Sequence, residues 1–85
     1  MKRRILLQKL ARGALRNVSF HDFRHLVEGF GFSLTRVNGS HHLFTHPEIP
    51  ELVNLQDVQG EAKPYQIRQF LRLVERYNLK LEDQG

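Results

Sequence analysis

Apolar residues recur with helical spacing after residue 18 of the chain. Four of them stand at positions i, i+3, i+4 and i+7: Phe23, Leu26, Val27 and Phe30. This spacing predicts an amphipathic helix with one buried face. Ser19 and Asp22 precede these residues at the spacing of a capping box, so the helix is expected to begin at Ser19. Gly29 and Gly31 mark its C-terminal end.

Residues 2–12 predict a shorter helix that ends at Gly13. Its apolar positions are Ile5, Leu6, Leu7 and Leu10, and its basic positions are Lys2, Arg3, Arg4, Lys9 and Arg12. The apolar set is not cleanly one-sided, which leaves two interpretations. The segment is either a basic leader that packs weakly, which we prefer, or a contact for phosphates or for a partner. Residues 14–18 are expected to be a connection.

A β-hairpin is predicted next. Residues 32–37 alternate apolar and polar, which is the period of a half-buried strand, with Phe32, Leu34 and the stem of Arg36 on one side. The pair Asn38-Gly39 favours a type I′ turn. A second strand is therefore expected to return through residues 41–46.

Alternation along this second strand separates its histidines. One face is expected to carry His41, Leu43 and Thr45, and the other to carry His42, Phe44 and His46. His41 and His42 cannot point the same way unless a bulge intervenes. Only one of them is therefore expected to belong to any one site.

A turn, a short strand and a loop are expected to follow the hairpin. Residues 47–50 contain two prolines and are expected to form a turn without strand structure. Residues 52–55 are predicted to form a third short strand, and residues 56–63 a polar loop around Gly60.

The last predicted element is a helix from Pro64 to about Asn78, since proline suits the first turn of a helix. Three arginines stand at i, i+4 and i+8 and form a basic ridge on it: Arg68, Arg72 and Arg76. This ridge is either a solvated face beside the core or a track for phosphates or for acidic side chains of a partner. The sequence favours neither.

These elements predict an α+β fold. The order α-β-β-β-α, with a three-stranded antiparallel sheet and both flanking helices on one face, is the order of the double-stranded RNA-binding fold. An N-terminal helix precedes it. The expected divisions are an extension and connection over residues 1–18, the domain over residues 19–79 and a tail over residues 80–85.

Composition narrows the class of function. The chain has 85 residues, which is one domain, and no cysteine, which excludes a disulfide or a thiolate metal site. No apolar run is long enough to span a membrane, and we expect a cytoplasmic protein. The formal net charge is +4, which favours an anionic partner, either nucleic acid or an acidic protein.

Residues 39–47 (GSHHLFTHP) hold three of the five histidines. An imidazole gives and takes protons near neutral pH, so this segment is a candidate for general acid–base chemistry on a polyanion. A metal site is not expected. His41 and His46 have no carboxylate or thiol at ligand spacing, and the helical pair His21 and His25 has no further ligand.

The chain resembles the HicA family of bacterial and archaeal toxins over roughly residues 19–79. The resemblance is carried by the helix end at residues 29–32 (GFGF), by residues 39–47, and by a loop with Gly60 and Lys63-Pro64 before the last helix. It implies the double-stranded RNA-binding fold and an endoribonuclease that cleaves mRNA without a metal or other cofactor. It also implies a HicB-type antitoxin that covers the active site in a hetero-oligomer.

The resemblance also implies roles for single residues. The family's catalytic histidine directly follows the Gly-Ser pair, which makes it His41, and His42 is the alternative. For this chemistry RNA supplies its own 2′-hydroxyl nucleophile, so the enzyme needs a base and donors to the phosphate. Lys63 is the expected phosphate ligand and Arg36 a weaker one, while Gly39 and Ser40 let the RNA backbone approach closely.

A different class of function fits the same fold. A non-catalytic module that binds RNA or a partner protein would use the same basic surface without cleaving anything. Its RNA affinity would fall steeply with salt, and RNA would stay intact in its presence.

Overall fold

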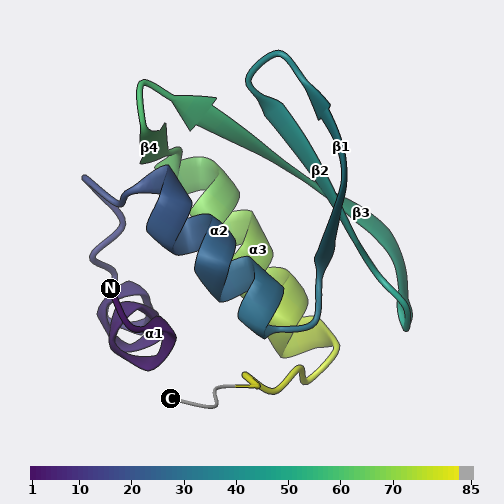
Figure 1. Ribbon diagram of the computed structural model, residues 1–85. Helices are drawn as coiled ribbons and strands as arrows, with labels where there is room; N and C mark the ends of the chain where they lie inside the picture. Colours follow the sequence, from purple (N-terminus) through teal and green to yellow (C-terminus); the bar gives the residue numbers. More distant parts are fainter. Residues whose placement is uncertain (83–85) are drawn as a thin grey trace.

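The computed structural model describes residues 1–82, and its elements lie in layers (Figure 1). Helix α1 (Arg3–Ala11) packs against α2 (Phe20–Gly29), and α2 and α3 (Pro64–Arg76) lie together on one face of an antiparallel sheet. The strands follow in chain order across the sheet: β1 (Ser33–Asn38), β2 (His41–His46), β3 (Ile49–Val58) and β4 (Glu61–Ala62). The predicted α+β class, with both flanking helices on one face, is confirmed. The sheet has a fourth strand of two residues that the sequence pattern did not predict.

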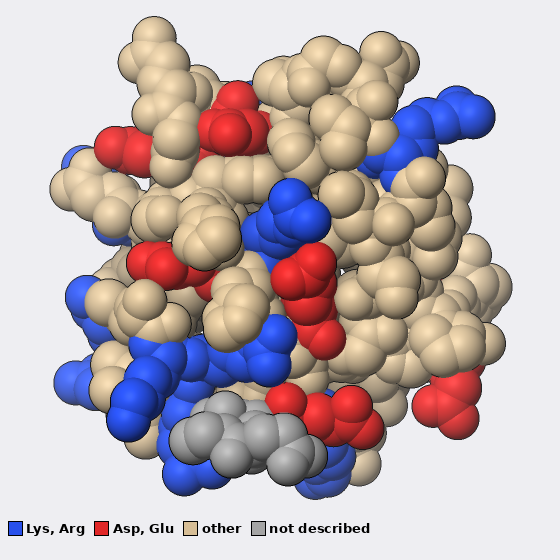
Figure 2. Space-filling view, in the orientation of Figure 1, with Lys and Arg blue, Asp and Glu red and all other residues tan. Residues whose placement is uncertain are grey.

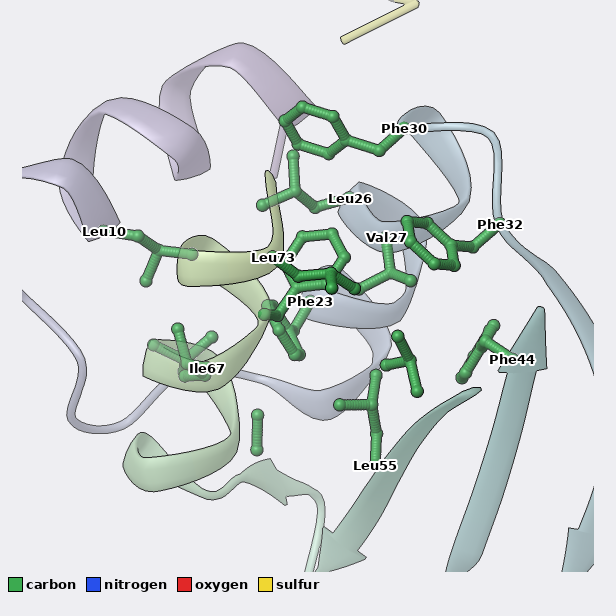
Figure 3. Packing of buried hydrophobic residues seen from close by; sticks show 14 of the residues in the cluster. Leu10, Phe23, Leu26, Val27, Phe30, Phe32, Phe44, Leu55, Ile67 and Leu73 are labelled. Carbon is green, nitrogen blue, oxygen red and sulfur yellow. The ribbon is translucent and has the colours of Figure 1, made fainter. Parts of the chain in front are cut away.

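The predicted apolar face of α2 forms the centre of the core (Figure 3). Phe23, Leu26 and Val27 have no exposed surface. The ring of Phe70 from α3 lies 5.6 Å from that of Phe23 and 5.5 Å from that of Phe32, in edge-to-face geometry. Each such pair contributes about 0.5–1.5 kcal/mol beyond its buried area, so aromatic contacts join the two helices to the start of the sheet.

The start of α2 follows the predicted cap. The Asp22 backbone N–H donates to Ser19 Oγ at 3.3 Å. The Asp22 carboxylate pairs with the N-terminal amine of Met1 at 3.1 Å. Asp22, in the first turn of α2, therefore also binds the N-terminal amine, and this ion pair holds the start of the chain beside α2.

The expectation of a weakly packed leader is wrong. Leu6 and Leu10 of α1 are only 3% and 2% exposed, because they stand one turn apart and share the face that contacts α2. The guanidinium of Arg3 also donates to the His25 carbonyl at 2.7 Å. Two buried leucines and this hydrogen bond hold α1 in a fixed position against α2.

The third strand is longer than predicted. It begins at Ile49, includes Pro50 and continues to Val58, so residues 49–50 are not a turn and residues 56–58 are not a loop. Pro50 is compatible with the strand because, within residues 1–82, β4 pairs only with Asp57 and Val58 on that edge. Gln59 and Gly60 both have positive φ, 53° and 86°, and form the tight turn into β4.

The turn of the first hairpin lies one residue later than predicted. Asn38 pairs with His41, so Gly39 and Ser40 are its central residues. Of these two only Gly39 has a positive φ, 62°, which is the pattern of a turn with glycine first rather than of type I′. Asn38 therefore stays in the strand, directly opposite His41.

The C-terminal tail returns to the helices. The Glu82 N–H donates to the Gly29 carbonyl at 2.8 Å, and residues 83–85 of the predicted tail lie outside the described residues. Within residues 1–82, no helix has the length and apolar character that a membrane crossing requires.

Gly31 offers a test of the junction between α2 and β1. Its φ is +97°, and a Cβ there would lie 2.9 Å from Nε2 of His46. The His46 ring is held against Phe32, at 5.0 Å, and accepts the Glu48 N–H. We expect Gly31→Ala to lower the free energy of unfolding in urea by about 2–4 kcal/mol, from backbone strain plus overpacking.

Gly13→Ala is the matched control. Gly13 has a similar φ of +91°, but a Cβ there would meet no described atom within 4 Å. We expect it to lose only the strain of the left-handed backbone, about 1–2 kcal/mol. Equal losses of unfolding free energy in the two variants would show that the His46 ring moves aside and that its contact with residue 31 does not affect stability.

Candidate active site

Strand β2 presents its two faces as predicted. Phe44 has no exposed surface and lies in the core. On the same face the His42 ring contacts that of Phe20 in α2, with 4.7 Å between ring centroids. His41 lies on the opposite face and is exposed to solvent. The two neighbouring histidines therefore have different surroundings, and only His41 lies on the outer face of the sheet.

The ring of His41 is held by Asn54 of β3. Nδ1 lies 3.3 Å from the Asn54 side-chain oxygen. An amide oxygen can only accept, so in the neutral ring Nδ1 carries the hydrogen of this contact and Nε2 has the lone pair. This arrangement leaves Nε2 able to accept a proton from a bound molecule.

His41 borders a shallow hollow of about 230 Å³ on the outer face of the sheet. Residues from β1, β2 and β3 line it: Arg36, Asn38, His41, Leu43 and Asn54. The lining contains one cation and no carboxylate, so it suits an anionic group. A proton acceptor, a cation and amide groups thus share one surface.

A β-bulge brings Arg36 to this hollow. Leu34 pairs with Phe44 but Arg36 pairs with Leu43, so Thr35 is an extra residue in β1. The Thr35 hydroxyl donates to the Leu43 carbonyl at 3.1 Å. The predicted placement of Arg36 on the side of Leu34 is wrong, because the extra residue turns Arg36 to the face that carries His41.

Gly39 and Ser40 form the exposed turn next to His41. A Cβ on Gly39 would meet no described atom within 4 Å, so the space in front of the turn is open. The Ser40 carbonyl lies 3.1 Å from Nδ1 of His42. That contact directs the His42 ring toward its own backbone and α2, away from the hollow.

Lys63 lies near the hollow but not in its lining. It is the residue before α3, and its Nζ donates to the Gln56 side-chain oxygen at 3.2 Å. Gln56 stands opposite His41 in the pairing of β2 with β3. Lys63 therefore contacts the residue that pairs with His41, but it is not among the residues that line the hollow.

Sequence reasoning missed Asn54 and Asn38. A signal for Asn54 was present, since it alternates with the buried residues Val53 and Leu55 and must face outward. That Asn54 lies beside His41 could not be predicted in the same way, because it depends on the register between β2 and β3.

The remaining histidines do not assemble a metal site. His21 and His25 are exposed on α2, and His46 packs on Phe32. Within residues 1–82 there is no group of three or more His, Cys, Asp or Glu side chains placed to share a metal ion.

The basic ridge of α3 borders a second, larger hollow of about 620 Å³. This hollow runs between α3 and the edge of β3, and Arg72 and Arg76 contribute to it. Arg76 pairs with Glu51 at 3.3 Å. The hydroxyl of Tyr77 donates to the same carboxylate at 2.7 Å, and this hydrogen bond raises the pKa of Tyr77 above its usual value. No imidazole lines this hollow, so the smaller one at His41 is the candidate for proton transfer.

Comparison with known proteins identifies a family. The family model described as the HicA toxin of bacterial toxin–antitoxin systems matches residues 20–75. No curated protein matches the chain, and no solved structure does.

The contact between His41 and Asn54 can be tested by NMR of the ring nitrogens. In Asn54→Ala the acceptor for Nδ1–H is lost, so we expect the ¹⁵N shifts of His41 to move toward the Nε2–H tautomer that a free histidine side chain prefers. His42, whose Nδ1 contacts a backbone carbonyl, is the internal control and should not change. Unchanged His41 shifts would mean that Asn54 does not set its tautomer.

The hydrogen bond from Tyr77 to Glu51 predicts a pH dependence of stability. The pKa of Tyr77 is raised in the folded protein, so its contribution is complete below about pH 10, the usual tyrosine value, and is lost as pH rises through the folded value. We expect Tyr77→Phe to lower the thermal midpoint at pH 8, with the difference from wild type shrinking above pH 10. Tyr65→Phe, at a residue 57% exposed, should leave the midpoint unchanged at pH 8.

Proposed function

Because the chain belongs to the HicA toxin family, the toxins of toxin–antitoxin systems, we propose that it is an endoribonuclease that cleaves mRNA without a metal ion. His41 is the proposed general acid–base group. The observation that carries the proposal is the outward-facing ring of His41, held through Nδ1 by Asn54 and placed in one hollow with Arg36. The proposed domain spans residues 19–79, with residues 1–18 as an extension and residues 80–85 as a tail; the matched range of 20–75 supports these limits.

The proposed reaction begins with proton transfer to His41. Nε2 accepts the proton of a ribose 2′-hydroxyl as its oxygen attacks the adjacent phosphorus. The bond between phosphorus and the 5′-oxygen breaks, and that oxygen takes a proton from water. The products are a 2′,3′-cyclic phosphate and a 5′-hydroxyl. His41 then returns its proton to solvent and is ready for another cycle.

Charge on the phosphate increases during this step, and the proposed donors are cationic. Arg36 is in the hollow with His41, so its guanidinium is the nearer candidate to hydrogen-bond two phosphate oxygens. Lys63 lies beyond Gln56 and suits a flanking phosphate. The open turn at Gly39 and Ser40 suits close approach of the RNA backbone.

The surroundings favour His41 over His42 as the catalytic residue. His42 is half-buried against Phe20, and its Nδ1 faces the Ser40 carbonyl. Moving it to the outer face would break its packing on α2. His42 is therefore proposed as a structural residue, and its variant below tests that assignment.

A HicB-type antitoxin is the proposed partner. A protein that covers the hollow at His41 would exclude RNA and inhibit the enzyme. The hollow is open to solvent on the outer face of the sheet, away from α2 and α3. The toxin can therefore be covered there without disturbing its core.

The proposed function can be tested with His41→Ala and His42→Ala in the presence of EDTA. We expect His41→Ala to lower RNA cleavage by about 10²–10⁴-fold, the usual contribution of a general acid–base group, and to keep the wild-type thermal midpoint, because the ring is exposed. His42→Ala should lower the thermal midpoint. At temperatures well below its own midpoint, this variant should still cleave RNA.

The two variants also distinguish the alternatives. Cleavage that survives in His41→Ala but disappears in folded His42→Ala would transfer the catalytic role to His42. RNA that stays intact with the wild-type protein would support the non-catalytic binding module instead.

A further inference from the structure

Positive charge is concentrated at the start of the chain. Residues 1–21 contain six of the 13 lysines and arginines and no aspartate or glutamate. Residues 22–85 contain the other seven together with all nine acidic residues, a formal net charge of −2. The matched family region, residues 20–75, has five basic and seven acidic residues and also carries −2. The excess positive charge of the protein therefore belongs to α1 and the connection after it.

The folded structure presents this charge outward. Leu6 and Leu10 of α1 are buried against α2, while Lys2, Lys9 and Arg12 are exposed. Arg16, in the connection, is exposed as well. In Figure 2 the Lys and Arg side chains gather at the lower left, over the region that α1 occupies in Figure 1. We call Lys9, Arg12 and Arg16 the α1 basic surface.

We propose that the α1 basic surface binds the phosphate backbone of single-stranded RNA and is a second RNA contact, separate from the hollow at His41. This inference rests on the proposed function in one respect, namely that the substrate is RNA. A domain with net negative charge repels a polyanion, whereas each lysine or arginine that contacts a phosphate releases a counterion and strengthens binding. Residues 22–85 alone, with a net charge of −2, therefore have little electrostatic attraction for RNA, and half of the six basic residues before them form the α1 basic surface.

The character of the surface favours RNA over a membrane or a protein. The leucine face of α1 is packed on α2, so it is not available to enter a lipid bilayer as an amphipathic membrane helix would. A protein partner usually needs an apolar centre in its interface. Lys9, Arg12 and Arg16 instead offer long flexible cations, which suit charges that repeat along a strand.

The position of α1 determines which kinetic constant it affects. The layer of α2 and α3 separates α1 from the sheet (Figure 1). The backbone that the structure describes spans only about 30 × 29 × 23 Å, so a long RNA can pass around its edge and reach both sites. A dinucleotide cannot. The α1 basic surface should therefore strengthen the binding of long RNA, lower its KM and leave kcat unchanged.

The test compares two triple variants of the full chain, both in the His41→Ala background so that RNA stays intact during binding. The first is Lys9→Gln with Arg12→Gln and Arg16→Gln. The second, Arg68→Gln with Arg72→Gln and Arg76→Gln, removes the same charge from the α3 ridge. Binding of a fluorescent single-stranded RNA is measured by anisotropy between about 50 and 200 mM salt. Circular dichroism confirms that both variants are folded.

We expect the first variant to bind long RNA about 100-fold more weakly near 0.1 M salt, with a salt slope reduced by about 2, since each lost phosphate contact contributes about 0.7. The affinity of the α3 ridge variant for the same RNA should fall much less. With His41 present, the first variant should cleave a dinucleotide as fast as wild type. Equal losses in the two variants would overturn the proposal, because net charge rather than α1 would then set the affinity. An unchanged affinity in the first variant would also overturn it.

The outcome is separate from that of the proposed function. If His41 is not catalytic, cleavage survives in His41→Ala. Binding is then compared with 2′-O-methyl RNA, which lacks the attacking hydroxyl and stays intact, and the comparison still reports on α1. If α1 does not bind RNA, its variant keeps the wild-type affinity while His41→Ala still abolishes cleavage.

Discussion

The burial of Phe44 is the constraint on which the candidate site depends. Its side chain has no exposed surface and packs among residues of the helices, so β2 can present only one face to the core. Because side chains alternate along a strand, a buried Phe44 directs His42 inward and His41 outward. A slip of one residue would bury His41 and expose Phe44, at a cost of about 1.5–3 kcal/mol for the phenylalanine alone. An apolar residue without chemistry of its own therefore sets the direction of the proposed catalytic ring.

The hollow at His41 combines this regular alternation with one irregularity. β2 and β3 supply His41 and Asn54 by ordinary pairing, whereas β1 supplies Arg36 only because Thr35 is an extra residue. Bulges are common next to active sites because they redirect a side chain without ending the strand. The site thus stands on three paired strands whose other face is covered by helices, which keeps its polar groups in fixed relative positions.

The structure places the proposed catalytic histidine and the excess positive charge on different layers of the molecule. The outer face of the sheet holds the imidazole, while the far layer, α1, holds the excess positive charge. Buried leucines join α1 to α2, so the basic segment has a fixed position rather than trailing from the domain. In the proposed function, this division gives a domain with net charge −2 over residues 22–85 a basic layer that can attract RNA.

Local patterns in the sequence determined the helices and the faces of β2. The apolar spacing of α2, its cap at Ser19, the start of α3 at Pro64 and the opposite faces of His41 and His42 all depend on residues close together in the chain, so they were predictable. Three features were not. The turn at Gly39 and Ser40, the extra Thr35 and the extension of β3 through Pro50 depend on how strands pair and which edge stays open. For the same reason, only the tertiary structure brought Arg36 and Asn54 to His41 and packed α1 on α2. The register between strands and the packing of separate segments come from contacts that no local pattern contains.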